Sequence, residues 1–333
     1  MRIAVDAMGG DYAPDELVKG SALAAQEGIE VILVGNTEQL EPLWDEVGRL
    51  PQLTIHHAPE VITMDDHPVE AVRKKRQSSL VQTIELVKKG QAGGAVSAGN
   101  TGATMAAALL LLGRLPGVLR PAIGSPMPTR KGMSIILDAG ANVDCRPQHL
   151  AQFAIMGSLY ASTVLGISSP KVALLNIGEE ESKGCELTLA AHALLKEAGA
   201  VNYIGSIEGR DISTGRADVI ICDGFVGNII LKFAEGLAEA LFAQLKEEMG
   251  RNLRGIAGGW LLLPHLRSIV RRLDYTEYGG APLLGVDGTC IIAHGSSNAK
   301  AILNAIRVAA QAVETSLTEK IRLRIQEMDG DTP

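Results

Sequence analysis

The sequence predicts an α/β fold in which helices cover both faces of a largely parallel sheet. Short apolar runs alternate with longer helix-forming segments along most of the 333-residue chain. Aromatic residues make up only 3% of the chain, while Ala, Gly, Leu, Ile and Val dominate, and such side chains suit helices that lie close on a sheet. Many apolar runs end in a polar turn that contains glycine, which is typical of a strand that leads into a helix.

These patterns give the elements in order. We expect strands at 3–5, 31–34, 53–55, 95–97, 134–137, 172–175, 202–204, 219–222, 283–286 and 290–293. We expect helices at 14–26, 69–89, 101–112, 148–165, 185–196, 228–249 and 297–327. One domain should span 1–328, with an amphipathic helical insertion at 250–280 and a tail at 329–333. Because the first strand begins almost at once, we expect no signal peptide, and no apolar stretch has membrane-spanning length.

The composition is that of an ordinary folded protein, with 46% hydrophobic and 21% charged residues. A formal charge of -7 and the scarcity of aromatic side chains argue against a nucleic-acid partner. Cys145, Cys185, Cys222 and Cys290 have no zinc or redox spacing, so we expect reduced thiols in a cytoplasmic protein. Dinucleotide, P-loop, metalloprotease and nucleophile-elbow motifs are absent from the sequence, so we expect no metal, cofactor or covalent nucleophile.

The segment Ser97-Ala98-Gly99-Asn100-Thr101-Gly102-Ala103 leads from a strand candidate into a helix candidate. Backbone N–H groups and the helix dipole make such a place suitable for a phosphate or another anion. Gly99 and Gly102 allow close approach of the backbone, and Asn100 and Thr101 add polar side chains. The alternative is a tight turn without a ligand.

Other strand candidates also end in turns with acidic or amide side chains. The residues concerned are Asp6, Asp11, Asp138, Asn142, Asp223 and Asn228. Because ligands of open α/β sheets bind at the carboxyl ends of strands, we expect several of these turns to line one cleft. The alternative is that α/β turns need their glycines for geometry alone.

Two further cationic or proton-carrying side chains lie in such turns. Lys183 stands before a helix, where it either binds an anion or is a surface lysine. The adjacent segment 179–181 is acidic, and a solvated first turn is favoured there over a metal site. His294 lies between a strand and the last helix, where it donates to a phosphate, handles a proton or satisfies nearby backbone groups.

Two basic segments are candidate partner surfaces. The first contains Arg73, Lys74, Lys75 and Arg76, and forms either a solvated face or a patch for an acidic partner. The second, 250–280, surrounds the apolar residues Trp260, Leu261 and Leu263 with arginines that include Arg267 and Arg271. It lies in a membrane interface, or it is a helical hairpin packed in a core or a dimer interface.

Taken in order, these motifs resemble those of the PlsX-type phosphate acyltransferases, the acyl-acyl carrier protein:phosphate acyltransferases of bacterial phospholipid synthesis. The resemblance rests on DAMGGD at 6–11, the 97–103 segment, LDAGAN at 137–142, the 175–184 segment, DVIICDGFVGNIILK at 218–232 and LGVDGTCIIAHGSSNAK at 284–300. Each motif alone is weakly specific, but the ordered set spans nearly the whole chain.

The resemblance implies a three-layer α/β/α sandwich, similar to the phosphotransacetylase and isopropylmalate dehydrogenase folds, with a helical segment protruding near 240–280. It implies transfer of a long-chain fatty acyl group from acyl carrier protein to inorganic phosphate, without a cofactor. A membrane acyltransferase would then pass the acyl group to glycerol 3-phosphate. It further implies a cytoplasmic homodimer in peripheral contact with the inner face of the membrane.

The same resemblance suggests roles for the candidate residues. Gly99, Asn100, Thr101 and Gly102 would hold phosphate, Lys183 would supply charge to phosphate or to an oxyanion, and His294 and Asn298 would orient groups or handle a proton. Asp6, Asp11, Asp138, Asn142, Asp223 and Asn228 would shape the cleft. The alternatives are a phosphotransacetylase that uses short acyl-CoA, a dehydrogenase of the related fold and a non-catalytic membrane scaffold.

Overall fold

The computed structural model describes residues 1–251, 256, 258–262, 265 and 278–330. Its strands are β1 Arg2–Asp6, β2 Glu30–Gly35, β3 Leu53–His57, β4 Gly94–Ser97, β5 Ala122–Thr129, β6 Gly132–Leu137, β7 Lys171–Leu175, β8 Asn202–Ile207, β9 Val219–Ile221, β10 Ala281–Leu284 and β11 Thr289–Ile292. Its helices are α1 Asp15–Gln26, α2 Thr37–Glu46, α3 Pro68–Lys74, α4 Ser79–Lys88, α5 Thr101–Ala107, α6 Pro147–Thr163, α7 Glu186–Ala198, α8 Gly224–Gly250, α10 Ala299–Glu314 and α11 Leu317–Gly330. Two short segments are a π-helix η1 Ala108–Leu112 and a 3-10 helix η2 Gly209–Thr214.

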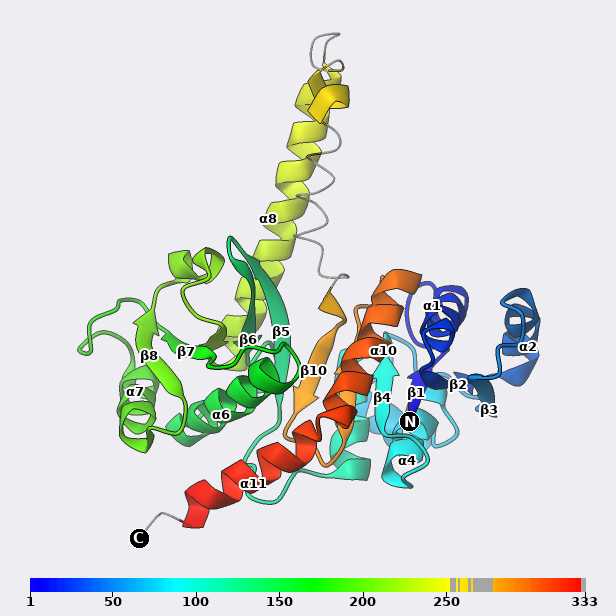
Figure 1. The fold of residues 1–333 in the computed structure, drawn as a ribbon, viewed down its shortest axis with the longest axis horizontal. Helices are drawn as coiled ribbons and strands as arrows, with labels where there is room; N and C mark the ends of the chain where they lie inside the picture. Colours follow the sequence, from blue (N-terminus) through cyan, green and yellow to red (C-terminus); the bar gives the residue numbers. More distant parts are fainter. Residues whose placement is uncertain (252–255, 257, 263–264, 266–277, 331–333) are drawn as a thin grey trace.

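The strands of the described residues form one sheet in the order β3-β2-β1-β4-β11-β10-β5-β6-β9-β7-β8. Helices α1, α10, α11 and α6 lie on the face turned to the viewer in Figure 1, and α4, α5 and α8 pack on the other face. The predicted three-layer α/β architecture is therefore confirmed.

Alternation along the strands explains why both faces carry helices. In β1, Ile3 and Val5 pack in the same apolar cluster as α1 and α10, while Ala4 packs in the opposite cluster with Leu86 of α4. In β6, Leu137 packs with α6 and α11, while Ile136 packs with α8. Apolar side chains on both faces are the pattern of a doubly covered sheet.

The sheet is parallel in each half but reverses direction in the middle. β3, β2, β1, β4 and β11 run parallel to one another, as do β6, β9, β7 and β8. The pairs β11–β10, β10–β5 and β5–β6 are antiparallel. The two parallel halves therefore run in opposite directions. Their carboxyl ends still meet at about one level of the sheet, because Leu137 at the end of β6 pairs with Gly124, the neighbouring Ile123 pairs with Leu283, and Pro282 pairs with Ile291 near the end of β11.

Strand β5 is absent from the predicted elements because it contains Pro126 and Pro128. A proline cannot donate to a neighbouring strand and usually excludes a residue from the interior of a sheet. Here β10 pairs only with Ala122 and Ile123, so both prolines lie where β5 has a partner on one side, β6.

Helix α2 was not predicted either, since Pro42 interrupts its sequence pattern. Two long helices predicted at 69–89 and 297–327 are each divided in the structure. The first is interrupted before Ser78, whose Oγ accepts the Val81 N–H as the N-cap of α4. The second turns at Ser316, whose φ of 54 lies in the left-handed region.

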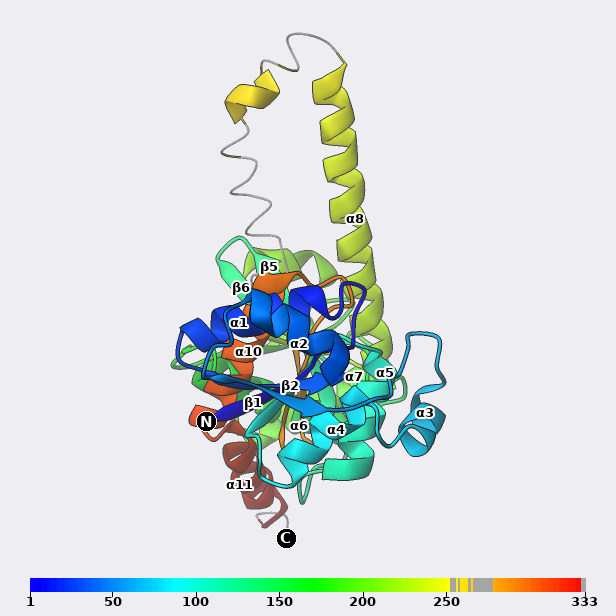
Figure 2. The same ribbon diagram turned by 90° about the vertical axis from the view of Figure 1, so that its right-hand side faces the viewer.

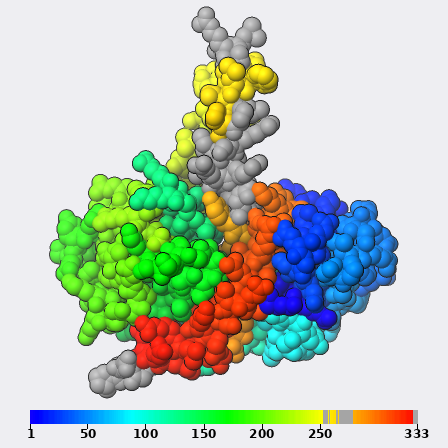
Figure 3. All heavy atoms as spheres, in the orientation of Figure 1, coloured from blue at the N-terminus to red at the C-terminus, as the bar shows by residue number. Residues whose placement is uncertain are grey.

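Helix α8 stands out from the body of the molecule, as Figures 1 and 3 show. Its 27 residues correspond to about 40 Å of helix, and a protruding helical segment was predicted for this region. Gly259 lies against the Met249 side chain, so 258–262 packs beside the outer end of α8. None of the helices within the described ranges combines the length and apolar character needed to cross a membrane.

Candidate functional site

The turns after β1 and β4 are joined around a buried carboxylate, Asp6. Ser97 donates its hydroxyl to Asp6 Oδ2 at 2.8 Å and accepts the Gly99 N–H on the same oxygen at 3.1 Å. Burial raises the pKa of Asp6 above its ordinary value, although hydrogen bonds from Ser79 and Ser97 oppose the shift. A Cβ on Gly9 would lie 2.5 Å from Asp6 Oδ2 and 2.9 Å from the Gly99 nitrogen, so this close approach requires glycine.

The turn after β11 joins the same group. Asp11 donates its N–H to the Gly295 carbonyl at 2.8 Å. His294 Nδ1 accepts the Ser296 N–H at 3.2 Å, so a neutral ring carries its proton on Nε2. Asn298 caps α10 by accepting the Ala301 N–H at 3.0 Å. We call the residues Asp6, Asp11, Ser97, Gly99, Asn100, His294 and Asn298 the amino-terminal cluster.

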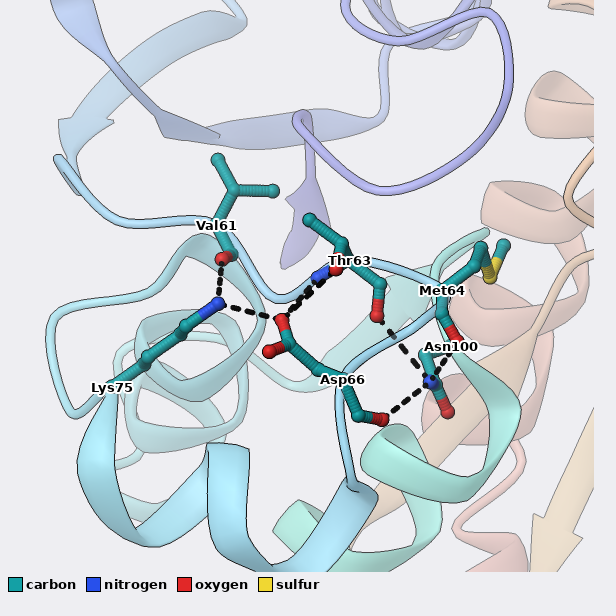
Figure 4. A network of polar contacts seen from close by, with 6 residues as sticks. All are labelled: Val61, Thr63, Met64, Asp66, Lys75 and Asn100. Atoms are coloured by element: carbon teal, nitrogen blue, oxygen red, sulfur yellow. Dashed lines mark hydrogen bonds and ion pairs between the residues drawn. The ribbon is translucent and has the colours of Figure 1, made fainter.

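Asn100 organises the beginning of α5, and Figure 4 shows its surroundings. Its Oδ1 accepts the Ala103 N–H at 3.0 Å, and its Nδ2 donates to the Met64 carbonyl at 3.1 Å, with longer bonds to the carbonyls of Thr63 and Asp66. Both ends of the Asn100 amide are therefore bound within the protein. Its contribution to a bound anion would come from its backbone and from the orientation of α5.

The segment 61–66 is held in turn by Lys75, which the sequence did not single out for this purpose. Lys75 Nζ contacts Asp66 Oδ2 at 2.6 Å and the Val61 carbonyl at 3.0 Å (Figure 4). The Lys75 hydrogen bond is the main reason that the pKa of Asp66 is lowered. No sequence signal links residues this far apart, because the contact depends on how α3 folds back on the chain.

The first turn of α5 leaves backbone donors available. The N–H groups of Thr101 and Gly102 have no acceptor among the described residues. Gly102 is required for another reason as well, since a Cβ there would lie 2.8 Å from Cγ of Pro68 in α3. The exposed side chain of Thr101 stands beside these donors.

A second group of turns is organised by Asp138, after β6. Its Oδ1 accepts N–H groups of Ile123 at 3.0 Å and Ala141 at 3.0 Å, and its Oδ2 accepts both the backbone N–H of Asn142 at 2.7 Å and the Asn142 amide at 2.9 Å. Burial raises the pKa of Asp138, while these hydrogen bonds oppose the shift. Asp138 therefore serves as the acceptor that shapes this turn.

The start of α8 is fused to the same turn. Gly224 donates to the Asn142 carbonyl at 2.8 Å, and Asp223 caps α8 by accepting the Val226 N–H at 2.9 Å. A Cβ on Gly227 would lie 1.9 Å from the Asp138 carbonyl oxygen. Asn228 is exposed beside Gly140. We call Asp138, Asn142, Asp223 and Asn228, with Gly224 and Gly227, the carboxyl-terminal cluster.

Lys183 lies in the turn after β7, at the same sheet edge as the carboxyl-terminal cluster. Its side chain is exposed, and no ion pair to it occurs within the described ranges. Glu179 pairs with Arg216 and Glu181 pairs with Lys196 at 2.7 Å. Among the described residues, no group of His, Cys, Asp and Glu is arranged to hold a metal ion.

The candidate residues thus form two groups, one at the carboxyl ends of each parallel half of the sheet. The reason is the reversal of strand direction at β10 and β5. The groups are linked by packing, because Ala103 and Ala106 of α5 share an apolar cluster with Ala139, Ala141 and Leu231 of the carboxyl-terminal half.

The predicted basic segments differ in how much of their charge is neutralised. Lys74 pairs with Glu70 and Lys75 with Asp66, while Arg73 and Arg76 are exposed. Trp260 and Leu261, near the outer end of α8, are 76% and 70% exposed, so this apolar surface lacks a cover from the described chain. Leu263, Arg267 and Arg271 lie outside the described residues.

The fold recurs in solved structures of several enzymes. A phosphotransacetylase from Streptococcus pyogenes is 21% identical with a TM-score of 0.63, covering 94% of each chain. A 4-hydroxythreonine-4-phosphate dehydrogenase from Klebsiella pneumoniae is 13% identical with a TM-score of 0.55, covering 94% of this chain and 98% of the other. The molecule therefore has the two-half α/β fold that these enzymes share.

The sequence comparisons are more specific than the fold. The family described as "Fatty acid synthesis protein" matches residues 1–320. A protein named phosphate acyltransferase from Desulforamulus reducens is 54% identical over 333 residues, covering 99% of each chain. A protein of the same name from Pelotomaculum thermopropionicum is 55% identical, covering 99% of this chain and 96% of the other. The chain belongs to this family of phosphate acyltransferases, and the resemblance drawn from its ordered motifs is confirmed.

Proposed function

We propose that this protein transfers a long-chain fatty acyl group from acyl carrier protein to inorganic phosphate, in the synthesis of phospholipids. The similarity to proteins named phosphate acyltransferase over nearly the full chain carries the proposal. The N–H groups at the beginning of α5, beside two buried and organised turns, support it because they suit an oxyanion.

In the proposed reaction a phosphate oxygen attacks the thioester carbonyl and forms a C–O bond. The carbonyl carbon passes through a tetrahedral oxyanion, the C–S bond breaks, and the electron pair leaves with the carrier thiolate, which then takes a proton. The products are acyl-phosphate and the free carrier thiol. Phosphate is a competent nucleophile near neutral pH, so the enzyme chiefly needs to position it and to stabilise the oxyanion.

We assign roles on this basis. The backbone around Gly99, Asn100, Thr101 and Gly102 would hold phosphate, and Lys183 would supply positive charge to phosphate or to the oxyanion. His294, whose Nε2 carries the proton of the neutral ring, would orient phosphate or return a proton to the thiolate. Asn298 would support His294 from the cap of α10. Asp6, Asp11, Asp138, Asn142, Asp223 and Asn228 would fix the shape of the two clusters.

Apolar surface beside the carboxyl-terminal cluster supports a fatty acyl substrate. Phe225 is 57% exposed and Ile229 is 51% exposed, one helical turn apart at the beginning of α8. Exposed apolar side chains of this size beside a polar turn suit an apolar chain that ends in a polar thioester.

The arrangement of the whole protein is also a proposal. We infer one catalytic domain over 1–328, with 250–280 as an insertion and 329–333 as a tail, and a cytoplasmic homodimer. The exposed Trp260 and Leu261 support peripheral contact with the inner face of the membrane. There a membrane acyltransferase would consume the acyl-phosphate.

The test is incubation of the purified protein with palmitoyl-acyl carrier protein, with and without inorganic phosphate. Release of free carrier thiol with an equal amount of acyl-phosphate, measured by mass spectrometry, is expected only with phosphate. Parallel reactions with acetyl-CoA and palmitoyl-CoA test the phosphotransacetylase alternative suggested by the fold. Absence of phosphate-dependent release from every donor would contradict the proposed enzyme and favour a scaffold.

A further inference from the structure

A hollow between η1, the 113–121 connection and the beginning of α6 gathers positive charge that the described chain does not neutralise. Its lining includes the three arginines Arg114, Arg120 and Arg146, with Asp144 as the one acidic residue. All three arginines are exposed, and none of them has an ion-pair partner among the described residues. The whole chain carries a formal charge of -7, so this local excess runs against the overall charge.

The walls of the hollow are held in place by side chains that donate hydrogen bonds to the nearby backbone carbonyl oxygens. Gln152 accepts the Leu119 N–H at 2.8 Å and donates to the Gly117 carbonyl at 2.9 Å. Asn142 donates to the Pro121 carbonyl at 2.7 Å, and Arg114 donates to the Leu119 carbonyl. The carbonyl oxygens of Gly117, Leu119 and Pro121, which would repel an anion, therefore already accept hydrogen bonds within the protein. The guanidinium groups of Arg120 and Arg146 remain as hydrogen-bond donors for a partner.

His149 adds a buried donor to this hollow. It is only 8% exposed, and its Nδ1 accepts the Arg146 N–H at 3.1 Å, which places the proton of the neutral ring on Nε2. Burial, with the charges of Arg120 and Arg146, lowers the pKa of His149, so the ring is neutral near pH 7. Arg120, Arg146 and His149 all line this one hollow.

The surroundings favour a protein partner over a small ion. Leu119 lines the hollow and is 42% exposed, and Leu110 and Val143, which adjoin the lining residues Leu109 and Asp144 in the sequence, are 45% and 64% exposed. Arginine among exposed apolar side chains is the composition of protein interfaces, where a guanidinium group pairs with a carboxylate through two hydrogen bonds.

We propose that the surface formed by Arg114, Arg120, Arg146, Leu119 and Val143 is the docking surface for acidic side chains of the acyl carrier protein. This inference rests on the proposed function, since it concerns the donor of that reaction. The hollow adjoins the carboxyl-terminal cluster, because Asn142 of that cluster donates at 2.7 Å to the carbonyl of Pro121, which lines the hollow, and Gly224 donates to the Asn142 carbonyl at 2.8 Å. A carrier docked here presents its thioester arm beside the turn of Asp138 and the start of α8.

The test compares two donors in the variant Arg120→Gln/Arg146→Gln, which leaves Arg114 and its bond to Leu119 in place. KM for palmitoyl-acyl carrier protein should rise about tenfold, while kcat/KM for palmitoyl-CoA and KM for phosphate stay at the wild-type values. The matched control is Arg130→Gln, an exposed arginine beyond the other end of β5, which should change neither donor. Direct titration of the variant with non-acylated carrier protein, together with thermal unfolding, separates weak docking from misfolding.

The outcomes separate this inference from the proposed function. Phosphate-dependent turnover by the wild type with an unchanged KM for the carrier-bound donor in the double variant would overturn the docking surface alone. Equal losses with palmitoyl-CoA would overturn it too, since the hollow would then serve the reaction itself. If Arg73→Gln/Arg76→Gln raised KM for palmitoyl-acyl carrier protein and Arg120→Gln/Arg146→Gln did not, the docking surface would be the basic segment at 73–76. No turnover by the wild type would remove the proposed function.

Discussion

At the scale of single residues, Lys183 is the side chain whose effect on turnover can be measured most independently of its effect on stability. It is exposed and has no ion pair within the described ranges, so Lys183→Ala should change the free energy of unfolding by no more than about 0.5 kcal/mol. Loss of the positive charge that we propose for phosphate or for the oxyanion should lower kcat by about 100-fold or more. The assay is phosphate-dependent release of carrier thiol.

The control for Lys183 is Lys196→Ala. Lys196 lies in the neighbouring helix α7 and is bound at 2.7 Å to Glu181, in a pair whose partners are both mostly exposed. Its loss should leave turnover unchanged, since surface pairs contribute little. A Lys183→Ala enzyme as active as the Lys196→Ala enzyme would remove Lys183 from the mechanism.

The buried carboxylate Asp6 predicts a pH effect of definite sign. Its pKa is raised by burial, so the folded protein binds this proton more tightly than the unfolded protein. The free energy of unfolding therefore falls as pH rises from the ordinary value of 3.8 through the folded-state pKa of Asp6. Below pH 3.8 the carboxyl is protonated in both states, and its ionisation does not affect stability.

Asp6→Asn removes this ionisation and retains an oxygen that can accept the Ser97 hydroxyl. The difference in Tm between variant and wild type should shift in favour of the variant as pH rises above the ordinary value of 3.8. Thermal unfolding at several pH values measures it. A difference that does not vary with pH would contradict a raised pKa at this position.

At the scale of elements, two glycines of α8 have opposite roles. A Cβ on Gly227 would lie 1.9 Å from the Asp138 carbonyl, whereas one on Gly236 would meet nothing within 4 Å. Gly236→Ala should stabilise the protein by about 0.5–1 kcal/mol, because alanine favours the helix. Gly227→Ala should destabilise it by roughly 1–3 kcal/mol or more, because backbone must move. Denaturant unfolding compares the two, and similar effects would contradict the fusion of α8 with the Asp138 turn.

The sequence predicts the elements better than the way in which they combine. The periodic runs located β1, β2, β4, β7 and most of the helices, because their apolar alternation is local information. The prolines of β5 concealed the strand at which the sheet reverses direction, and because of that reversal the two halves contribute their turns from opposite directions. The turns form two clusters, which α5 links through an apolar cluster that it shares with Ala139 and Ala141. A single cleft lined by both clusters stays a prediction.

In the candidate site, too, local features could be predicted from the sequence and tertiary contacts could not. The motif at 97–103 correctly marks a strand that leads into a helix, since its glycines and its cap are adjacent in the chain. The carbonyl oxygens that accept hydrogen bonds from Asn100 Nδ2 lie more than thirty positions away, at Thr63, Met64 and Asp66 (Figure 4). Such contacts depend on tertiary packing, so the sequence could not show that both polar ends of this side chain are hydrogen-bonded within the protein.

At the scale of the whole molecule, α8 and the 258–262 segment beside its outer end carry two apolar surfaces that suit different partners. Along the helix, residues four positions apart share one face and are exposed: Phe233 at 68%, Leu237 at 46%, Leu241 at 56% and Leu245 at 41%. Near its outer end, Trp260 and Leu261 are exposed as well. A stripe along a helix suits a second copy of the chain, whereas an apolar tip with a bulky aromatic residue suits a lipid interface.

These assignments predict that the two surfaces can be inactivated separately. Leu237→Glu/Leu241→Glu should convert a dimer into a monomer, measured by light scattering after size-exclusion chromatography, because burying two carboxylates without partners costs more than the interface gains. Trp260→Glu/Leu261→Glu should leave the dimer intact and abolish sedimentation with anionic liposomes, while activity on acyl carrier protein in solution persists. If the tip variant dissociated the dimer and the stripe variant did not, the outer end of α8 would be the subunit interface, and the lipid contact would have to lie elsewhere.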